Sequence, residues 1–189
     1  GQTGKDLGTV TYTDADGVAI YLKGDSSSTP VIDDAVLKGK KVVLNETSGA
    51  TGKNKIGILA NLGNDATITT EVDPVTNNLK NVVAYFTENK DLTVLSDFSL
   101  GEESVGISGK TGKKLTYGDG TNPYTMNVAK NSTGVFGDNV INLKDKTEIK
   151  LNDEKAIGAY AKGSNGVINA DGKLTFTKES AVGLYVENG

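Results

Sequence analysis

The chain has 189 residues and a formal net charge of −4; it lacks His, Cys and Trp, and all 20 of its positive residues are Lys. Without His and Cys there is no imidazole base, no Ser-His-Asp triad, no thiolate nucleophile and no zinc or iron–sulfur ligand set, and without Arg there is no bidentate clamp for carboxylate or phosphate. The scattered Lys residues make no basic stripe for nucleic acid, and no apolar run reaches the ~20 residues of a membrane-spanning helix. The composition favours a structural or binding protein without a cofactor.

Seven short apolar segments recur along the chain and share a small residue at their second position. They cover residues 18–21, 56–59, 82–85, 105–108, 133–136, 157–160 and 182–185. The second position is Gly in five segments and Ala19 or Val83 in the other two. These positions are spaced by 38, 26, 23, 28, 24 and 25 residues. A period near 25 residues is typical of a solenoid.

Each repeat contains two further apolar-polar-apolar strands. One precedes the small residue, at 10–12, 98–100, 126–128, 149–151 and 174–176, and one follows it, at 92–94, 115–117, 141–143 and 167–168. Three short strands and three turns account for about 25 residues. The sequence therefore predicts an all-β, right-handed parallel β-helix of about seven coils, with residues 1–189 as one segment. A β-sandwich of hairpins is the second interpretation, but it does not explain a fixed period.

Alternation along each Gly segment predicts which side chains face outward. Side chains one before, one after and three after the small residue should point inward, with Thr133 as the polar exception. The small residue and the position two after it should point outward. We expect the latter to form an aromatic ladder that binds a partner, built from Tyr21, Tyr85, Phe136, Tyr160 and Tyr185. The alternative is structural, with each ring shielding the Gly of a neighbouring rung.

The first repeat is longer than the others by roughly 13 residues, which predicts a loop insertion at 23–41. Loops of this kind often carry binding residues, here Asp25, Ser26, Ser27, Ser28, Thr29 and Pro30. A tolerated insertion without function is the equal alternative, because closing a longer loop costs little entropy.

The carboxylates predict neither a metal site nor catalytic residues. Residues 14–17 read Asp-Ala-Asp-Gly, as in some calcium loops, but no Glu follows at the required spacing. The adjacent pairs Asp33–Asp34 and Glu102–Glu103 should point in opposite directions in an extended chain. A carbohydrate-active β-helix enzyme, a lyase or hydrolase, remains the alternative function; it would need carboxylates from different rungs on one face.

The repeats at 156–161 and 180–185, preceded by Lys173-Leu174-Thr175-Phe176, resemble the passenger repeats of large autotransporter adhesins of fusobacteria and relatives. The resemblance implies a surface-exposed stalk or binding segment, not an enzyme, that mediates attachment to a host or bacterial surface protein or glycan. It also implies a bacterial cell-surface location, with anchoring through a C-terminal membrane barrel outside this chain and no membrane insertion of this segment. A purely structural spacer is a further alternative.

The chain starts at Gly1 without Met, and we expect it to be a fragment of a longer passenger domain that is monomeric in its parent. The fragment's open ends would expose unpaired strand edges, which predicts end-to-end self-association.

Overall fold

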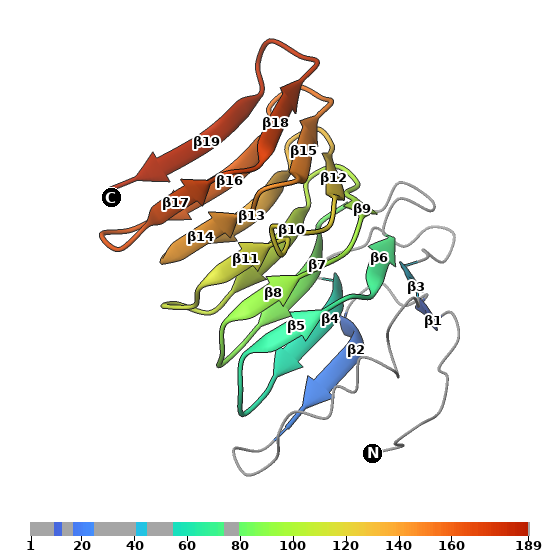
Figure 1. Cartoon of the computed structure of the whole chain (residues 1–189). Coiled ribbons are helices and arrows are strands. Elements are labelled where there is room, and N and C mark those ends of the chain that lie inside the picture. The colour runs from blue at the N-terminus through green and yellow to red at the C-terminus, as the bar shows by residue number, and fades with distance from the viewer. Residues whose placement is uncertain (1–9, 13–16, 25–40, 45–54, 74–79, 189) are drawn as a thin grey trace.

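In the computed structural model, residues 10–12, 17–24, 41–44, 55–73 and 80–188 are described, and they form strands joined by turns, without a helix (Figure 1). The strands in chain order are β1 (Val10–Tyr12), β2 (Gly17–Lys23), β3 (Lys41–Leu44), β4 (Lys55–Asn61), β5 (Ala66–Ile68), β6 (Glu71–Asp73), β7 (Val82–Thr87), β8 (Leu92–Val94), β9 (Phe98–Ser99), β10 (Val105–Gly109), β11 (Leu115–Tyr117), β12 (Tyr124–Val128), β13 (Thr133–Gly137), β14 (Val140–Leu143), β15 (Thr147–Leu151), β16 (Ile157–Lys162), β17 (Val167–Ala170), β18 (Lys173–Phe176) and β19 (Val182–Glu187).

The strands stack into four parallel sheets. Sheet A has the order β1-β3-β6, sheet B β19-β16-β13-β10-β7-β4-β2, sheet C β17-β14-β11-β8-β5 and sheet D β18-β15-β12-β9. Along the chain a strand of sheet A or D comes first in each turn, a strand of sheet B second and a strand of sheet C third. This confirms the predicted parallel β-solenoid with three strands per turn.

Five turns carry a strand on all three sides, and the first and last described turns carry two. The expectation of about seven complete coils was therefore too high for the described residues. Strand pairing is not equally continuous on the three sides of the solenoid. Sheet B runs unbroken through all seven strands, whereas sheets A and D are separate ladders, because β6 and β9 contact each other without pairing in register.

Strand pairing corrects the repeat in β7. Ile56 pairs with Val83 and Ile58 with Tyr85, so Gly57 lies beside Ala84 rather than Val83. The pairing of β7 with β10 aligns Gly106 with Ala84 in the same way. The column that we call the small-residue column therefore contains Ala19, Gly57, Ala84, Gly106, Gly134, Gly158 and Gly183.

The small-residue column faces the core, not the solvent as expected. A Cβ added at Gly134 would lie 2.8 Å from the Met126 sulfur, and one at Gly106 would lie 3.0 Å from the Phe98 ring. Both partners are buried residues of sheet D. Glycine therefore leaves room on one wall of the solenoid for a large side chain from another.

Each sheet B strand breaks its alternation at this column. The ladder registers skip the small residue, and the residue after it is also buried, as at Ile107 and Val135. Two successive inward residues mark a local break in the strand alternation, while neighbouring strands stay aligned one residue to one. In consequence the residue before the column is half-buried instead of inside, which explains why Thr133 is tolerated there. The expected inward positions one and three after the small residue are buried in most inner turns, but Gly109, and Phe86 in the alignment expected from the sequence, are half-buried.

The corner that leads into sheet B repeats as a left-handed residue three positions before the small-residue column. Its members are Asn81, Glu103, Asn131 and Lys155, with φ between 54° and 57°. Asn tolerates this conformation better than Glu or Lys does. The corner therefore follows from the geometry of the turn rather than from one residue type.

Candidate partner-binding face

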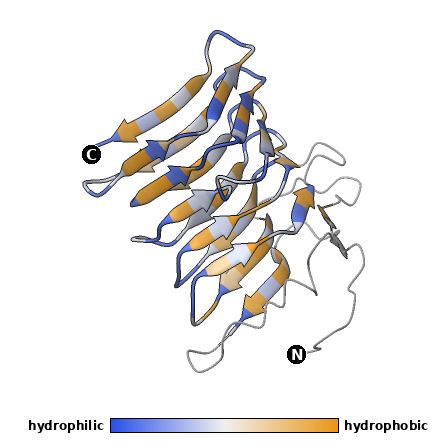
Figure 2. Cartoon of the chain, in the orientation of Figure 1, coloured by the Kyte–Doolittle hydropathy of each residue, from blue (hydrophilic) through white to orange (hydrophobic). Residues whose placement is uncertain are grey.

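The outer face of sheet B carries two apolar columns, which lie on either side of the small-residue column. The aliphatic column, one position before it, contains Val18, Ile56, Val83, Val105, Thr133, Ile157 and Val182. The aromatic column, two positions after it, contains Tyr21, Leu59, Phe86, Ser108, Phe136, Tyr160 and Tyr185. Figure 2 shows hydrophobic segments along the sheet B strands.

Three of the expected ladder residues contact one another. The Phe136 and Tyr160 rings lie with centroids 5.1 Å apart, and the Tyr160 and Tyr185 rings 4.9 Å apart, both edge to face. This arrangement is the favourable one for aromatic rings. Tyr21, 52% exposed, lies at the other end of the same column, where its hydroxyl accepts a 2.9 Å hydrogen bond from the Asn61 amide.

The Tyr160 hydroxyl donates a hydrogen bond to the Glu187 carboxylate. This hydrogen bond, and burial after it, raises the pKa of Tyr160 to about 12. Because the phenol stays protonated, it serves as a neutral donor and an apolar ring, not as a base.

Tyr85 was wrongly expected on this face. Its side chain is 0% exposed and lies in the core. The hydroxyl donates to the Thr70 carbonyl at 2.8 Å and accepts the Val72 N–H at 3.0 Å. Phe86 takes its place in the aromatic column. Sequence reasoning missed Phe86 because Val83, instead of the smaller Ala84, was aligned with the glycines.

The structural alternative for the ladder stays a prediction. The side-chain positions of the glycines face the core, where side chains such as Phe98, Met126 and Leu174 lie against them. Any shielding by the rings would therefore concern the outer side of the backbone. Within the aromatic column, Leu59 and Ser108, which neighbour Phe86 on either side, are 9% and 7% exposed.

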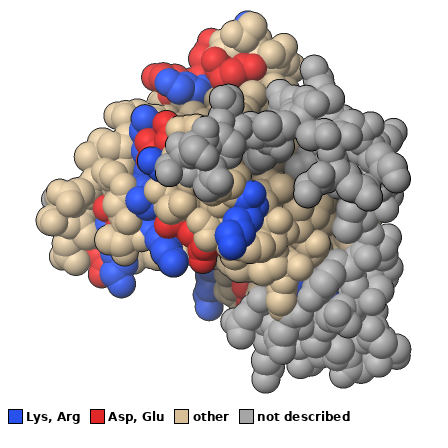
Figure 3. All heavy atoms as spheres, turned by 90° about the horizontal axis from the view of Figure 1, so that it is seen from below, with Lys and Arg blue, Asp and Glu red and all other residues tan. Residues whose placement is uncertain are grey.

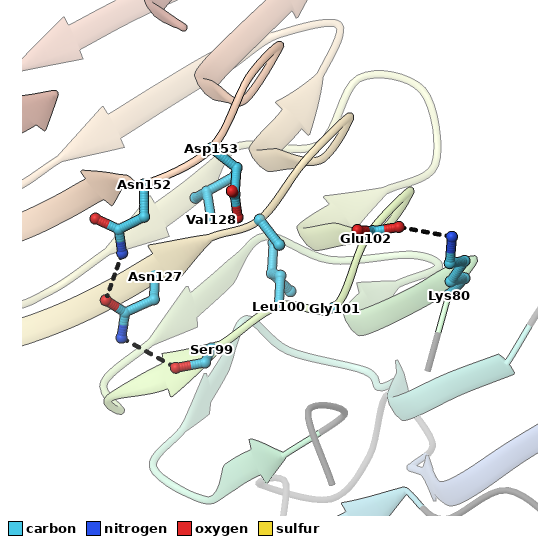
Figure 4. A pocket seen from close by; sticks show the side chains of 10 residues that line it. Lys80, Ser99, Leu100, Gly101, Glu102, Asn127, Val128, Asn152 and Asp153 are labelled. Carbon is cyan, nitrogen blue, oxygen red and sulfur yellow. Dashed lines mark hydrogen bonds and ion pairs between the residues drawn. The ribbon is translucent and has the colours of Figure 1, made fainter. Parts of the chain in front are cut away.

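A second feature is an open groove of about 510 Å³ beside sheet D (Figure 4). The Asn127 amide donates to Ser99 Oγ at 3.0 Å, and the Asn152 amide lies 3.4 Å from Asn127 Oδ1. On the other side Lys80 pairs with Glu102 at 2.6 Å. The hydrogen bond from Lys80 holds the pKa of Glu102 below its ordinary value, and the same contact raises the pKa of Lys80. Both groups thus keep their charge, which suits neither a general acid nor a general base.

The adjacent carboxylates Glu102 and Glu103 do not point apart as expected. Both reach Lys80, at 2.6 and 3.7 Å, because Glu103 has a left-handed backbone, with φ 56°, instead of an extended one. Lys and carboxylate side chains are interspersed on the face shown in Figure 3, without a large patch of one sign among the described residues.

The remaining predicted site residues lie outside the described residues. These are the loop residues Asp25, Ser26, Ser27, Ser28, Thr29 and Pro30, together with Asp14, Asp16, Asp33 and Asp34. In the part of the chain that is described, no group of three acidic residues is placed to hold a metal ion. That part also contains no helix with the length and hydropathy needed to cross a membrane.

No protein-family model matches the chain, and no significant match was found among curated proteins or solved structures.

Proposed function

We propose that this chain is a non-catalytic adhesion segment of a bacterial surface protein, with the outer face of sheet B as its binding surface. The partner is a protein or glycan on a host or bacterial cell. The observation that carries the proposal is the pair of apolar columns on the outside of a seven-stranded sheet. Exposed Tyr and Phe rings contribute much of the binding energy in protein interfaces and also stack on sugar rings.

The other outer faces differ from this one in chemistry. Sheet C exposes a ladder of Thr and Asn, in which the Asn169 amide donates to Asn142 at 2.9 Å and Asn142 to Thr116 at 3.3 Å. Sheet D exposes charged residues such as Glu148 and Lys150, which lie 3.7 Å apart. Because these groups pair within the chain, the sheet B face offers the extended apolar area among these three outer faces of the described residues, and it lies on a stack of parallel strands. The cell-surface location is part of the proposal and rests on the repeat resemblance, and right-handed winding is part of it as a prediction.

The test is binding of the purified chain to glycan arrays and to intact host and bacterial cells. Replacing Phe136, Tyr160 and Tyr185 together by Ser should weaken binding by at least ~10-fold, the loss expected for interface aromatics. Tyr124→Ser is the matched control, because Tyr124 is a partly exposed tyrosine outside sheet B whose hydroxyl contacts Asp119. Circular dichroism must show that all variants keep their β-structure.

Three outcomes contradict the proposal. Equal binding by the wild type and the triple variant would exclude the sheet B face, and no binding by any form would favour a spacer. Release of new reducing ends from a polysaccharide would show that the chain is an enzyme.

A further inference from the structure

The last described turn exposes residues that belong to core columns. Leu184 and Val186 in β19 are 41% and 46% exposed, whereas Ala159 and Ala161, their partners in β16, are 0% exposed. Phe176 in β18 is 50% exposed, whereas its partner Leu151 is 0% exposed. These side chains belong to the same columns as the buried ones, so core residues are uncovered at this end of the described solenoid. Figure 1 shows β18 and β19 as the last strands of the stack.

β19 and β2 are the two edge strands of sheet B, and both present unpaired backbone groups within the described residues. All strands of the sheet are parallel, so β2 of one copy can add to β19 of another in the same direction as every interior pair. Extending the columns places Val18 beside Val182, Tyr21 beside Tyr185 and Leu22 beside Val186. Each column would continue with a residue of its own kind.

The side chains four positions after the small-residue column make the fit directional. We call this set the charged column; it contains Lys23, Asn61, Glu88, Lys110, Asp138, Lys162 and Glu187. Asn61 is the one uncharged member, and from Glu88 onward the charges alternate in sign. Glu88 pairs with Lys110 at 3.5 Å. Lys162 and Glu187 are register partners in the same way.

The two ends of the charged column carry opposite charges, Lys23 in β2 and Glu187 in β19. Stacking the β2 end of one copy on the β19 end of another brings these charges together. Joining two β19 ends or two β2 ends with their cores aligned would instead pair the edge strands antiparallel, so Glu187 or Lys23 would face the opposite end of the other strand and lose this charge match. The head-to-tail joint keeps both the parallel pairing of sheet B and the opposite charges in one column.

We infer that a second copy of this chain docks on the β19 end of the solenoid through its own β2 edge, head to tail. Such an interface is heterologous, since two different surfaces meet, and each added copy leaves a new β19 end free. The product is therefore an open series of oligomers rather than a closed dimer. This inference is independent of any partner on the sheet B face.

The experiment is sedimentation velocity of the whole chain over a series of concentrations at low ionic strength. The wild type should show growing species beyond the dimer. Glu187→Lys and Lys23→Glu should each shift the distribution towards monomer, because each places like charges at the interface. The double variant Lys23→Glu/Glu187→Lys should restore the series. Glu154→Lys changes the net charge equally at an exposed site within an interior turn, and should assemble as the wild type does.

Three results would overturn the inference. They are a wild type that stays monomeric at every concentration, assembly that stops at a dimer, and a double variant that assembles no better than the single ones. Rescue by the charge swap also separates a direct contact from loss of the Tyr160–Glu187 hydrogen bond, because the swap does not restore that bond.

Discussion

Sheets A and D occupy the same side of the solenoid, yet they differ in how the core behind them is filled. Behind sheet D, bulky residues such as Phe98 and Met126 pack over Gly106 and Gly134, and the ladder from β9 to β18 is continuous. Where sheet A ends at β6, the small-residue column carries Ala84 and the next residue is the large Tyr85.

At this boundary the core holds an aromatic cluster instead of an aliphatic layer. The Tyr85 and Phe98 centroids lie 5.1 Å apart, and those of Phe98 and Tyr117 5.9 Å apart. The Val72 N–H, at the edge of sheet A, is satisfied by the Tyr85 hydroxyl. The comparison indicates that side-chain size in sheet B and strand pairing in the sheets facing it are linked. Where sheet B carries glycine, the large residues of sheet D fit against it and the sheet D strands pair. Where sheet B carries Tyr85, the tyrosine hydroxyl bonds the Val72 N–H at the edge of sheet A.

The largest expected effect is at the glycines behind sheet D. In Gly134→Ala the new Cβ would lie 2.5 Å from the Gly158 carbonyl oxygen and 2.8 Å from the Met126 sulfur. Overpacking of this kind should lower the free energy of unfolding by about 3 kcal/mol. Ala84→Gly, in the same column at the boundary, is the control and should cost only about 1 kcal/mol. Urea unfolding measures both, and equal losses would contradict the difference between the two regions.

High pH should act on the boundary through its buried tyrosines. Burial raises the pKa of Tyr85 and of Tyr117 above the ordinary value of 10.0. The unfolded chain then ionises first, so the stabilisation is complete below pH 10 and is lost as the pH rises above it. The expected slope is about 1.4 kcal/mol per pH unit for each tyrosine.

Urea midpoints measured on both sides of pH 10 test this loss. The double variant Tyr85→Phe/Tyr117→Phe is the control, since it should reduce the pH dependence. The part that remains comes from Tyr160 and Tyr124, whose pKa values are also raised. A wild type with constant stability across this range would show that the Tyr85 and Tyr117 hydroxyls are not buried.

Removing one hydroxyl should separate the two tyrosines at neutral pH. Tyr85→Phe removes the hydroxyl that donates to the Thr70 carbonyl and accepts from the Val72 N–H, and the loss of these two hydrogen bonds should cost about 2 kcal/mol. Tyr117→Phe loses one longer bond, 3.2 Å to the Ser96 carbonyl, and should cost about 1 kcal/mol. Thermal unfolding of both variants gives the order, and the reverse order would mean that Tyr85 does not hold the edge of sheet A.

The smallest effect is expected at the repeated corner. Lys155 has φ 56°, a conformation that suits Asn or Gly better than Lys. Lys155→Asn should therefore stabilise the chain by about 0.5 kcal/mol. Asn131→Lys is the matched reverse change at the same corner of the preceding turn and should destabilise by a similar amount. If both variants matched the wild type in thermal unfolding, the corner would contribute nothing.

Much of the fold was predictable because residues of similar size and polarity recur at the same positions of each repeat. The period, the order of the three strands and the parallel stacking all follow from spacing. The break in alternation at the small-residue column was not predictable, since hydropathy alternation assumes a regular strand and carries no information on where that regularity is lost. This break reversed the expected direction of the glycines.

The candidate site was predictable wherever the alignment of the repeated segments could be read from the sequence. Phe136, Tyr160 and Tyr185 lie together because their segments contain an unambiguous Gly. In residues 82–85 both Val83 and Ala84 fit the pattern, and only residue size favours Ala84. Choosing the smaller residue would have placed Tyr85 in the core and Phe86 in the aromatic column.

The lack of strand pairing between β6 and β9 has a mechanical consequence. In a solenoid each turn contacts only its neighbours, so a pull along the axis passes through every interface in series. Between the five turns that carry three strands, three ladders share that load at every interface except one: between the turn of β6 and the turn of β9 only sheets B and C do. Under tension we expect these five turns to separate first at this interface, with the turns on either side still wound.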